Sequence, residues 1–184
     1  MRFAYYQKLT PSQKKIYDES DRIVSVPLYR PAIHRERSAS LALVLATGDR
    51  LATERWAQAL CDGLTEAFGV PALEVGVMER RPSWRTGELH GLYEAGSPGL
   101  YKISLWMRTA RRAHVVKFKT FLRTLLHELC HHLDYHRFRL RDSFHTAGFY
   151  RRESSLMRQL LPGETAPKRA GSTRLAQDSN RGIE

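Results

Sequence analysis

The sequence predicts an α+β fold, and three observations support this. Apolar residues recur at steps of three and four between residues 118 and 133, which is the period of an amphipathic helix. Three short apolar segments lie between residues 72 and 107, separated by turn-rich stretches as β-strands are. Helical patterns precede and follow these segments. We therefore expect N-terminal helices, a three-stranded sheet, a long histidine-bearing helix and a C-terminal helix.

The N-terminal part of the chain predicts two helices. The first begins at Thr10 and Pro11, because threonine is a good cap and proline suits the first helical position. Residues 25–38 are broken by two prolines and predict an extended connection. The second helix is expected from about residues 47–49 to Gly69. Its expected core residues are Leu51, Trp56, Leu60, Leu64 and Phe68.

Three strands are predicted next, over residues 72–79, 88–94 and 100–107. The first places Leu73, Val75 and Val77 at alternate positions, so we expect these three side chains to point to the core.

The long helix is predicted from about Arg112 to His136. Its apolar residues form one stripe, opposite His127 and His131, so the helix buries its back and exposes its histidines. The stripe comprises Phe118, Phe121, Leu122, Leu125, Leu126, Leu129 and Leu133.

A last helix carries Phe149, Leu156, Met157 and Leu160 and is expected to end at residues 161–163, where a proline and a glycine follow. We expect residues 1–163 to form a single domain. Residues 164–184 have few large apolar side chains and no periodicity, which predicts a disordered basic tail.

Composition narrows the class of protein. The net charge of +11 favours polyanionic partners or acidic substrates, although a basic surface also serves solubility. The two cysteines are too few for a disulfide framework, and Cys130 is expected to be a small core residue. No segment has the apolar length of a membrane span or a signal peptide. These features predict a cytoplasmic protein without a membrane anchor.

The segment His127-Glu128-Leu129-Cys130-His131 has the form HExxH, in which two histidines lie one helical turn apart. Two imidazoles at this spacing can each donate one nitrogen to Zn²⁺. The sequence therefore predicts a zinc site at His127 and His131.

A catalytic zinc ion needs a third protein ligand, and two downstream residues are candidates. His145 and Glu153 can both return to the histidine face, and zinc accepts either ligand type. His136 would project nearly opposite His127, and His132 would point to the apolar side, so we expect both to be core or edge residues.

The chain resembles the SprT-like zinc metalloproteases, a minimal zincin fold whose third ligand lies in an HGxxF-type element. The resemblance rests on the HExxH helix, on the preceding strands (Thr86-Gly-Glu-Leu-His-Gly-Leu-Tyr93 and Ile103-Ser104-Leu105) and on the spacing from His145 to Phe149. It covers roughly residues 48–160, with Thr146 in place of the family's glycine. It implies a zincin-like metallopeptidase domain in residues 1–163, with His145 as the third zinc ligand.

The expected reaction is hydrolysis of a peptide bond in a protein or peptide substrate. Zn²⁺ would activate a water molecule, and Glu128 would be the general base that takes its proton.

Asp134 is either an acceptor for a ligand imidazole or a surface carboxylate. Tyr150 is either an oxyanion donor or a helix-packing residue. We expect the strand at residues 100–107 to pair with an extended substrate.

The alternative is a basic nucleic-acid-binding protein with a structural or inactive zinc site. Residues 108–123 carry six basic residues and no acidic one. Weak DNA binding without sequence preference is therefore expected, unless these residues only form a solvated face. The glutamate in HExxH favours the peptidase, because a structural zinc has no use for it. Hydrolysis of a non-peptide substrate would need the same apparatus.

Overall fold

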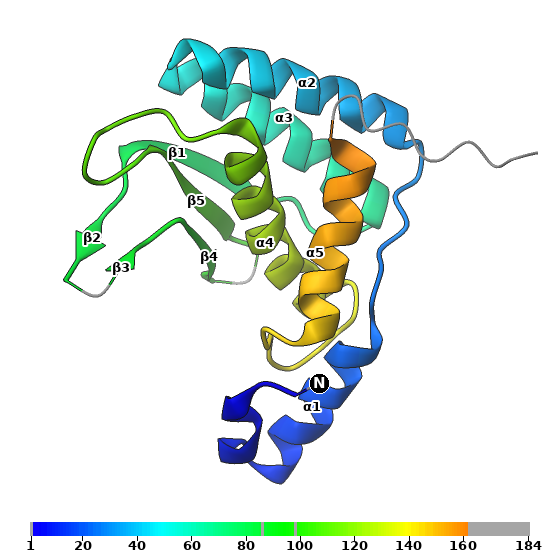
Figure 1. Cartoon of the computed structure of the whole chain (residues 1–184). Coiled ribbons are helices and arrows are strands. Elements are labelled where there is room, and N and C mark those ends of the chain that lie inside the picture. The colour runs from blue at the N-terminus through cyan, green and yellow to red at the C-terminus, as the bar shows by residue number, and fades with distance from the viewer. Residues whose placement is uncertain (1, 86, 98, 162–184) are drawn as a thin grey trace, which may run out of the picture.

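The computed structural model describes residues 2–85, 87–97 and 99–161. It confirms the α+β prediction, with N-terminal helices, a three-stranded mixed sheet and two C-terminal helices (Figure 1). The predicted tail at residues 164–184 lies outside the described residues. No helix in the described part of the chain combines the length and the apolar run that crossing a bilayer requires.

The N-terminal helices are η1 (Ala4–Lys8), α1 (Pro11–Arg22), α2 (Pro31–Thr47) and α3 (Arg50–Phe68). Thr10 caps α1 with the reciprocal hydrogen bonds of a capping box to Gln13. The extended connection predicted for residues 25–38 is wrong from Pro31 onward, because that proline is the first residue of α2. A proline is compatible with a helix at this position, where its missing N–H has no partner to lose.

Two predicted core residues of α3 are exposed instead. Leu51 is 54% exposed and Trp56 is 37% exposed, whereas Leu60, Leu64 and Phe68 are buried as predicted. α3 packs against both α2 and β1. Its buried residues include three small side chains that the prediction from large apolar residues did not include, namely Thr53, Ala57 and Cys61.

The sheet has the order β1-β5-β4, formed by β1 (Glu74–Arg80), β5 (Tyr101–Arg108) and β4 (Gly91–Ala95). β5 is central, parallel to β1 and antiparallel to β4. The prediction that residues 100–107 offer a free edge is therefore wrong, since both sides of β5 are paired. A separate ribbon is formed by β2 (Ser83–Trp84) and β3 (Gly87–Glu88).

The outer edge of β1 is covered by side chains of α3. The backbone N–H groups of Val75 and Val77 donate to Gln58 (2.7 Å) and Glu54 (2.8 Å). Arg50 donates to the carbonyl of Val77, and Gln58 donates to that of Leu73. These contacts occupy backbone groups that another strand would need.

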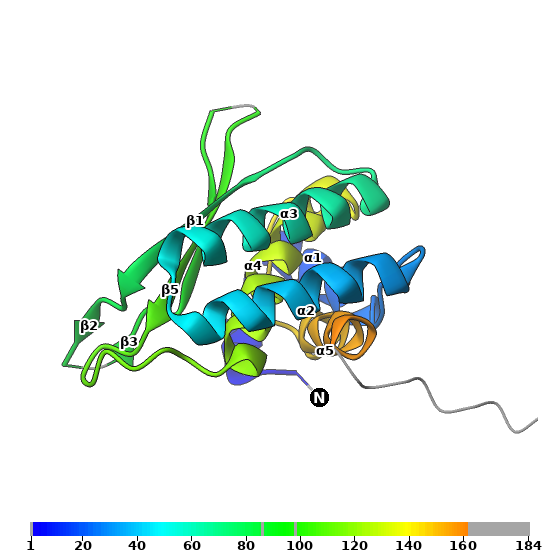
Figure 2. The ribbon, with the colours of Figure 1, turned by 90° about the horizontal axis from the view of Figure 1, so that it is seen from above.

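The core lies where the sheet meets α3 and α4 (Figure 2). Leu73, Val75 and Val77 are buried as predicted, opposite Ile103 and Leu105 of β5. α4 (Phe118–His136) contributes its apolar stripe, and α5 (Ala147–Leu160) packs on α4. Cys130 is fully buried, as expected.

α4 begins at Phe118 and not at Arg112. The intervening residues form a turn in which Thr109 N–H donates to the carbonyl of His114, and Ala113 has a φ of 51°. Val116 N–H then donates to the carbonyl of Met107. These bonds extend the strand pairing past β5 and prevent an earlier helix start.

Candidate metal centre

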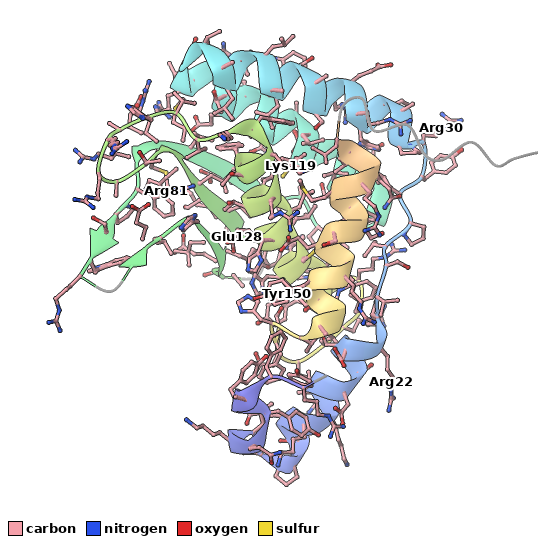
Figure 3. The ribbon with its side chains drawn as sticks, viewed as in Figure 1. Arg22, Arg30, Arg81, Lys119, Glu128 and Tyr150 are labelled. Atoms are coloured by element: carbon pink, nitrogen blue, oxygen red, sulfur yellow. The ribbon has the colours of Figure 1, made fainter. Side chains whose placement is uncertain are left out.

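The predicted face of α4 carries His127 and His131 on the side where α4 meets β4 and α5. The buried stripe on the opposite side fixes the rotation of the helix, so both rings lie partly exposed. Glu128 lies beside them, 7% exposed, and burial raises the pKa of its carboxyl group. Figure 3 shows Glu128 on α4 and Tyr150 at the start of α5, close to one another in this view.

His145 reaches the same place from the loop between α4 and α5. After α4 ends, the Leu140 N–H donates to the carbonyl of Asp134, and Arg139 adopts a φ of 56°, so the chain turns back. Thr146 then caps α5 by accepting a hydrogen bond from the Phe149 N–H. The turn and the cap together place His145 against the histidine face.

The three imidazoles converge through their Nε2 atoms. Nε2 of His145 lies 3.0 Å from Nε2 of His127 and 3.1 Å from Nε2 of His131. Burial lowers the pKa of His131 to about 3, with the neighbouring imidazoles adding to the effect. Burial also lowers the pKa of His145. His131 and His145 are therefore disposed to remain neutral and to offer lone pairs.

Glu153 is a hydrogen-bond partner of His127 and is not a member of the three-histidine group. Its carboxylate accepts a hydrogen bond from Nδ1 of His127 at 3.0 Å and another from Arg123 at 3.0 Å. Because a carboxylate accepts and does not donate, Nδ1 of His127 is the donor, which in a neutral ring leaves Nε2 without a proton.

His131 is oriented by a second chain of hydrogen bonds. The Ser143 hydroxyl lies 2.7 Å from Nδ1 of His131 and donates to Asp134 at 2.8 Å. Ser143 therefore accepts from Nδ1, which again leaves Nε2 without a proton. Asp134 is fully buried and accepts from Arg152 at 2.7 Å, so it is a supporting residue and not a surface carboxylate.

These contacts fit a metal ion. The Nε2 spacings of 3.0 and 3.1 Å are close to the separation of about 3.3 Å that tetrahedral Zn²⁺ would set between two bound nitrogens. Among the described residues, these three histidines form a group that could hold a metal ion. Three histidines leave the fourth tetrahedral position open.

A cleft of about 480 Å³ borders the site on the side of Glu128. The residues that line it are His90, Gly91, Thr120, Arg123, Thr124, His127, Glu128, Tyr150 and Glu153. A larger hollow of about 600 Å³ lies between α3 and β1 and holds none of the three histidines. The smaller cleft is therefore the candidate binding site, because His127 and Glu128 line it.

β4 positions Glu128 by close contact. The backbone of Tyr93 faces the carboxylate and lowers its pKa, against the larger opposite effect of burial. Gly91 allows this approach, because a Cβ atom there would lie 2.7 Å from Oε1 of Glu128 and 2.6 Å from Cγ2 of Thr124.

The remaining histidines of α4 lie where the sequence predicted. His132 is fully buried, and its Nδ1 and Nε2 lie 3.0 Å from the Tyr93 hydroxyl and 2.9 Å from the carbonyl of Pro71. His136 packs on the ring of Tyr101, with centroids 4.4 Å apart. Tyr150 is 41% exposed and stacks on His145, so it faces the site more than the core.

Sequence reasoning did not identify Ser143, Arg152, Gly91 or Tyr93 as parts of the site. Their roles depend on contacts between segments far apart in the chain, and only Asp134, one turn after His131, gave a local signal.

The fold and the site together are consistent with a zincin-like metal centre, in which an HxxxH pair on a helix is completed by a third histidine. Comparisons with protein-family models, with curated proteins and with solved structures find no match to this chain.

Proposed function

We propose that this protein is a zinc-dependent metallopeptidase of the SprT-like type. The observation that carries the proposal is the convergence of His127, His131 and His145 beside the buried carboxylate of Glu128. A structural zinc site has a full set of protein ligands and no need for an adjacent base. A site with an open position and a base next to it suits activation of water.

The residues around the site have distinct tasks in this reaction. Bound zinc would supply the Lewis acidity that lowers the pKa of water to about 7 and polarises a carbonyl group. Glu128 accepts the proton of the attacking water and delivers it to the leaving amine. Burial raises the pKa of Glu128 from its ordinary value, which makes it a better proton acceptor. The neighbouring backbone of Tyr93 partly offsets this rise in the pKa.

The two edges of the sheet support β4 as the substrate-binding strand. The edge of β1 is occupied by side chains of α3. β4 lies at the other edge, has no further strand beside it in the described part of the chain, and contributes Gly91 to the cleft. An extended peptide pairing with β4 would pass alongside Glu128.

A second candidate function is weak binding of DNA without sequence preference. It is favoured by the turn after β5, where Arg80 donates to the carbonyls of Ala110 and Arg111 and so lies beside exposed Arg111 and Arg112. Two of the six basic residues in the segment 108–123 form ion pairs, Arg108 with Glu79 and Arg123 with Glu153. The turn therefore supports DNA binding more strongly than helix α4 does.

The test of the peptidase is a comparison of Glu128→Gln with the parent protein. We expect about one zinc per chain in both, and hydrolysis of an unfolded protein substrate only in the parent, because the substitution removes the base alone. Glu36→Gln is the matched control, since Glu36 is an exposed acid on α2, outside the cleft. A parent without zinc, or a Glu128→Gln variant as active as the parent, would contradict the proposal.

A further inference from the structure

The N-terminal segment formed by η1 and α1, residues 3–22, lies across the loop that carries His145. Figure 1 shows η1 and α1 below the rest of the fold, next to the start of α5. We call this segment the N-terminal strap. It is remote from the histidines in sequence, and its contacts with the metal centre are polar as well as apolar.

The closest link is made by Tyr5. Its hydroxyl donates to the backbone carbonyl of His145 at 3.0 Å. The Tyr5 ring packs edge to face on Tyr17, with centroids 5.8 Å apart, and Tyr17 in turn packs on Phe144 at 6.2 Å. The residue before the third histidine and the carbonyl of that histidine are thus both held by the strap.

The C-terminus of α1 and the N-terminus of α5 also cap one another. The Asp21 side chain accepts a hydrogen bond from the Gly148 N–H at 2.8 Å. Arg152 of α5 donates to the carbonyls of Ser20 (2.6 Å) and Ile23 (2.7 Å). An acid at one helix start and a cation at the other helix end both complement the helix dipoles.

Arg152 connects this junction to the second histidine. The same guanidinium donates to Asp134, whose other oxygen accepts from Ser143, the partner of His131. The strap therefore reaches two of the three imidazoles, one directly through the loop and one through a buried ion pair.

We infer that the N-terminal strap stabilises the metal-binding arrangement of the histidines and that Tyr5 is a positioning residue for His145. The inference rests on the proposed metal site. His145 is exposed and stands in a loop, so without restraint it would lose conformational freedom on binding a metal. The hydrogen bond from Tyr5 restricts the loop beforehand, which favours metal binding.

Two adjacent tyrosines allow a matched test in the full-length protein. Tyr5→Phe removes the hydroxyl that reaches His145, whereas Tyr6→Phe removes one that donates to Asp18 within the strap itself. We expect Tyr5→Phe to bind zinc about tenfold more weakly than the parent in competition with a chromophoric chelator, the lower end of what supporting residues cost. The Tyr6→Phe variant should match the parent.

The second readout is the visible absorption of Co²⁺ bound in place of zinc, which reports the geometry around the ion. Tyr5→Phe should change this spectrum, while the thermal unfolding of the metal-free Tyr5→Phe and Tyr6→Phe variants should be alike. A purely structural role for Tyr5 predicts the opposite, with altered unfolding and an unchanged spectrum, and would overturn the inference.

Gly148→Ala provides an independent variant. A Cβ atom at this position would come within 2.6 Å of the carbonyl of Ser20 and closer still to that of Asp21, so the strap must move away. Alanine is otherwise better than glycine in a helix by about 1 kcal/mol, so weaker zinc binding by this variant would come from the displaced strap. Zinc affinity equal to the parent in both Tyr5→Phe and Gly148→Ala would refute the inference. A parent that binds no zinc would refute the proposed function itself.

Discussion

The carboxylate of Glu153 lies 3.0 Å from Nδ1 of His127, on the far side of the ring from the nitrogen that faces His145. The two residues that the sequence offers as a third ligand therefore have different places in the structure. His145 belongs to the three-histidine group that could hold a metal ion, whereas Glu153 is a hydrogen-bond partner of one of these histidines.

This arrangement predicts different effects for the two substitutions. His145→Ala should lose most of the metal, because only two nitrogens remain. Glu153→Gln should keep about one zinc per chain but bind it about 10- to 100-fold more weakly, as supporting residues do. Metal content after dialysis and titration against a chelator measure both. If Glu153→Gln is empty and His145→Ala is loaded, the assignment must be reversed.

Gly91 predicts a separation of metal binding from hydrolysis. In Gly91→Ala the added methyl group would displace Glu128 and Thr124, whose side chains are its nearest neighbours. We expect normal zinc content and a rate of peptide hydrolysis about a hundredfold lower, since a shift of about 1 Å in a catalytic group can cost that much. Gly87→Ala is the control, because a Cβ atom at Gly87 has nothing within 4 Å. Equal rates in the two variants would show that Gly91 does not position the base.

Arg152 predicts a large change in stability. Both Arg152 and its partner Asp134 are fully buried, so Arg152→Met would leave an unpaired buried carboxylate and cost about 3–5 kcal/mol in the free energy of unfolding. The exposed pair of Arg2 and Asp18 serves for comparison, and Arg2→Ala should cost about 0–1 kcal/mol. Urea unfolding of the metal-free proteins measures both values. A loss below about 1 kcal/mol in Arg152→Met would mean that the pair contributes little.

DNA binding is tested by titration of labelled duplex and single-stranded DNA at two salt concentrations. If Arg111 and Arg112 neutralise phosphates, affinity should fall steeply with salt, and each arginine replaced by alanine should reduce the slope by about one. Arg22→Ala is the control, since Arg22 is exposed on α1, away from the turn (Figure 3). No binding near physiological salt, or binding that ignores salt, would remove this function.

The parts of the site that sequence reasoning anticipated are those that depend on local spacing. His127, Glu128 and His131 lie within one and a half turns of a helix whose buried stripe fixes their direction, so their relation could be read directly. His145 was one of two open candidates from the residues alone, because its approach depends on a turn at Arg139 that no sequence pattern signals.

The errors in the fold have similar causes. A proline breaks a helix from within but is well tolerated at its first position. The sequence alone does not show that Pro31 lies at the first position of α2. The order of the strands was not predictable either, since nothing in residues 100–107 shows that they pair on both sides. Ser143 contacts His131 directly and Arg152 supports it through Asp134, and both contacts arise only from the tertiary fold.

The covered edge of β1 has a consequence for the behaviour of the protein in concentrated solution. Sheets of neighbouring molecules join most readily through unpaired strand edges, and α3 removes one of the two edges by occupying its backbone groups with Gln58, Glu54 and Arg50. Continuous filaments need two complementary edges on every molecule. Strand pairing between copies would therefore stop at a pair joined through β4, and such a pair would cover the edge at which we propose that an extended substrate binds.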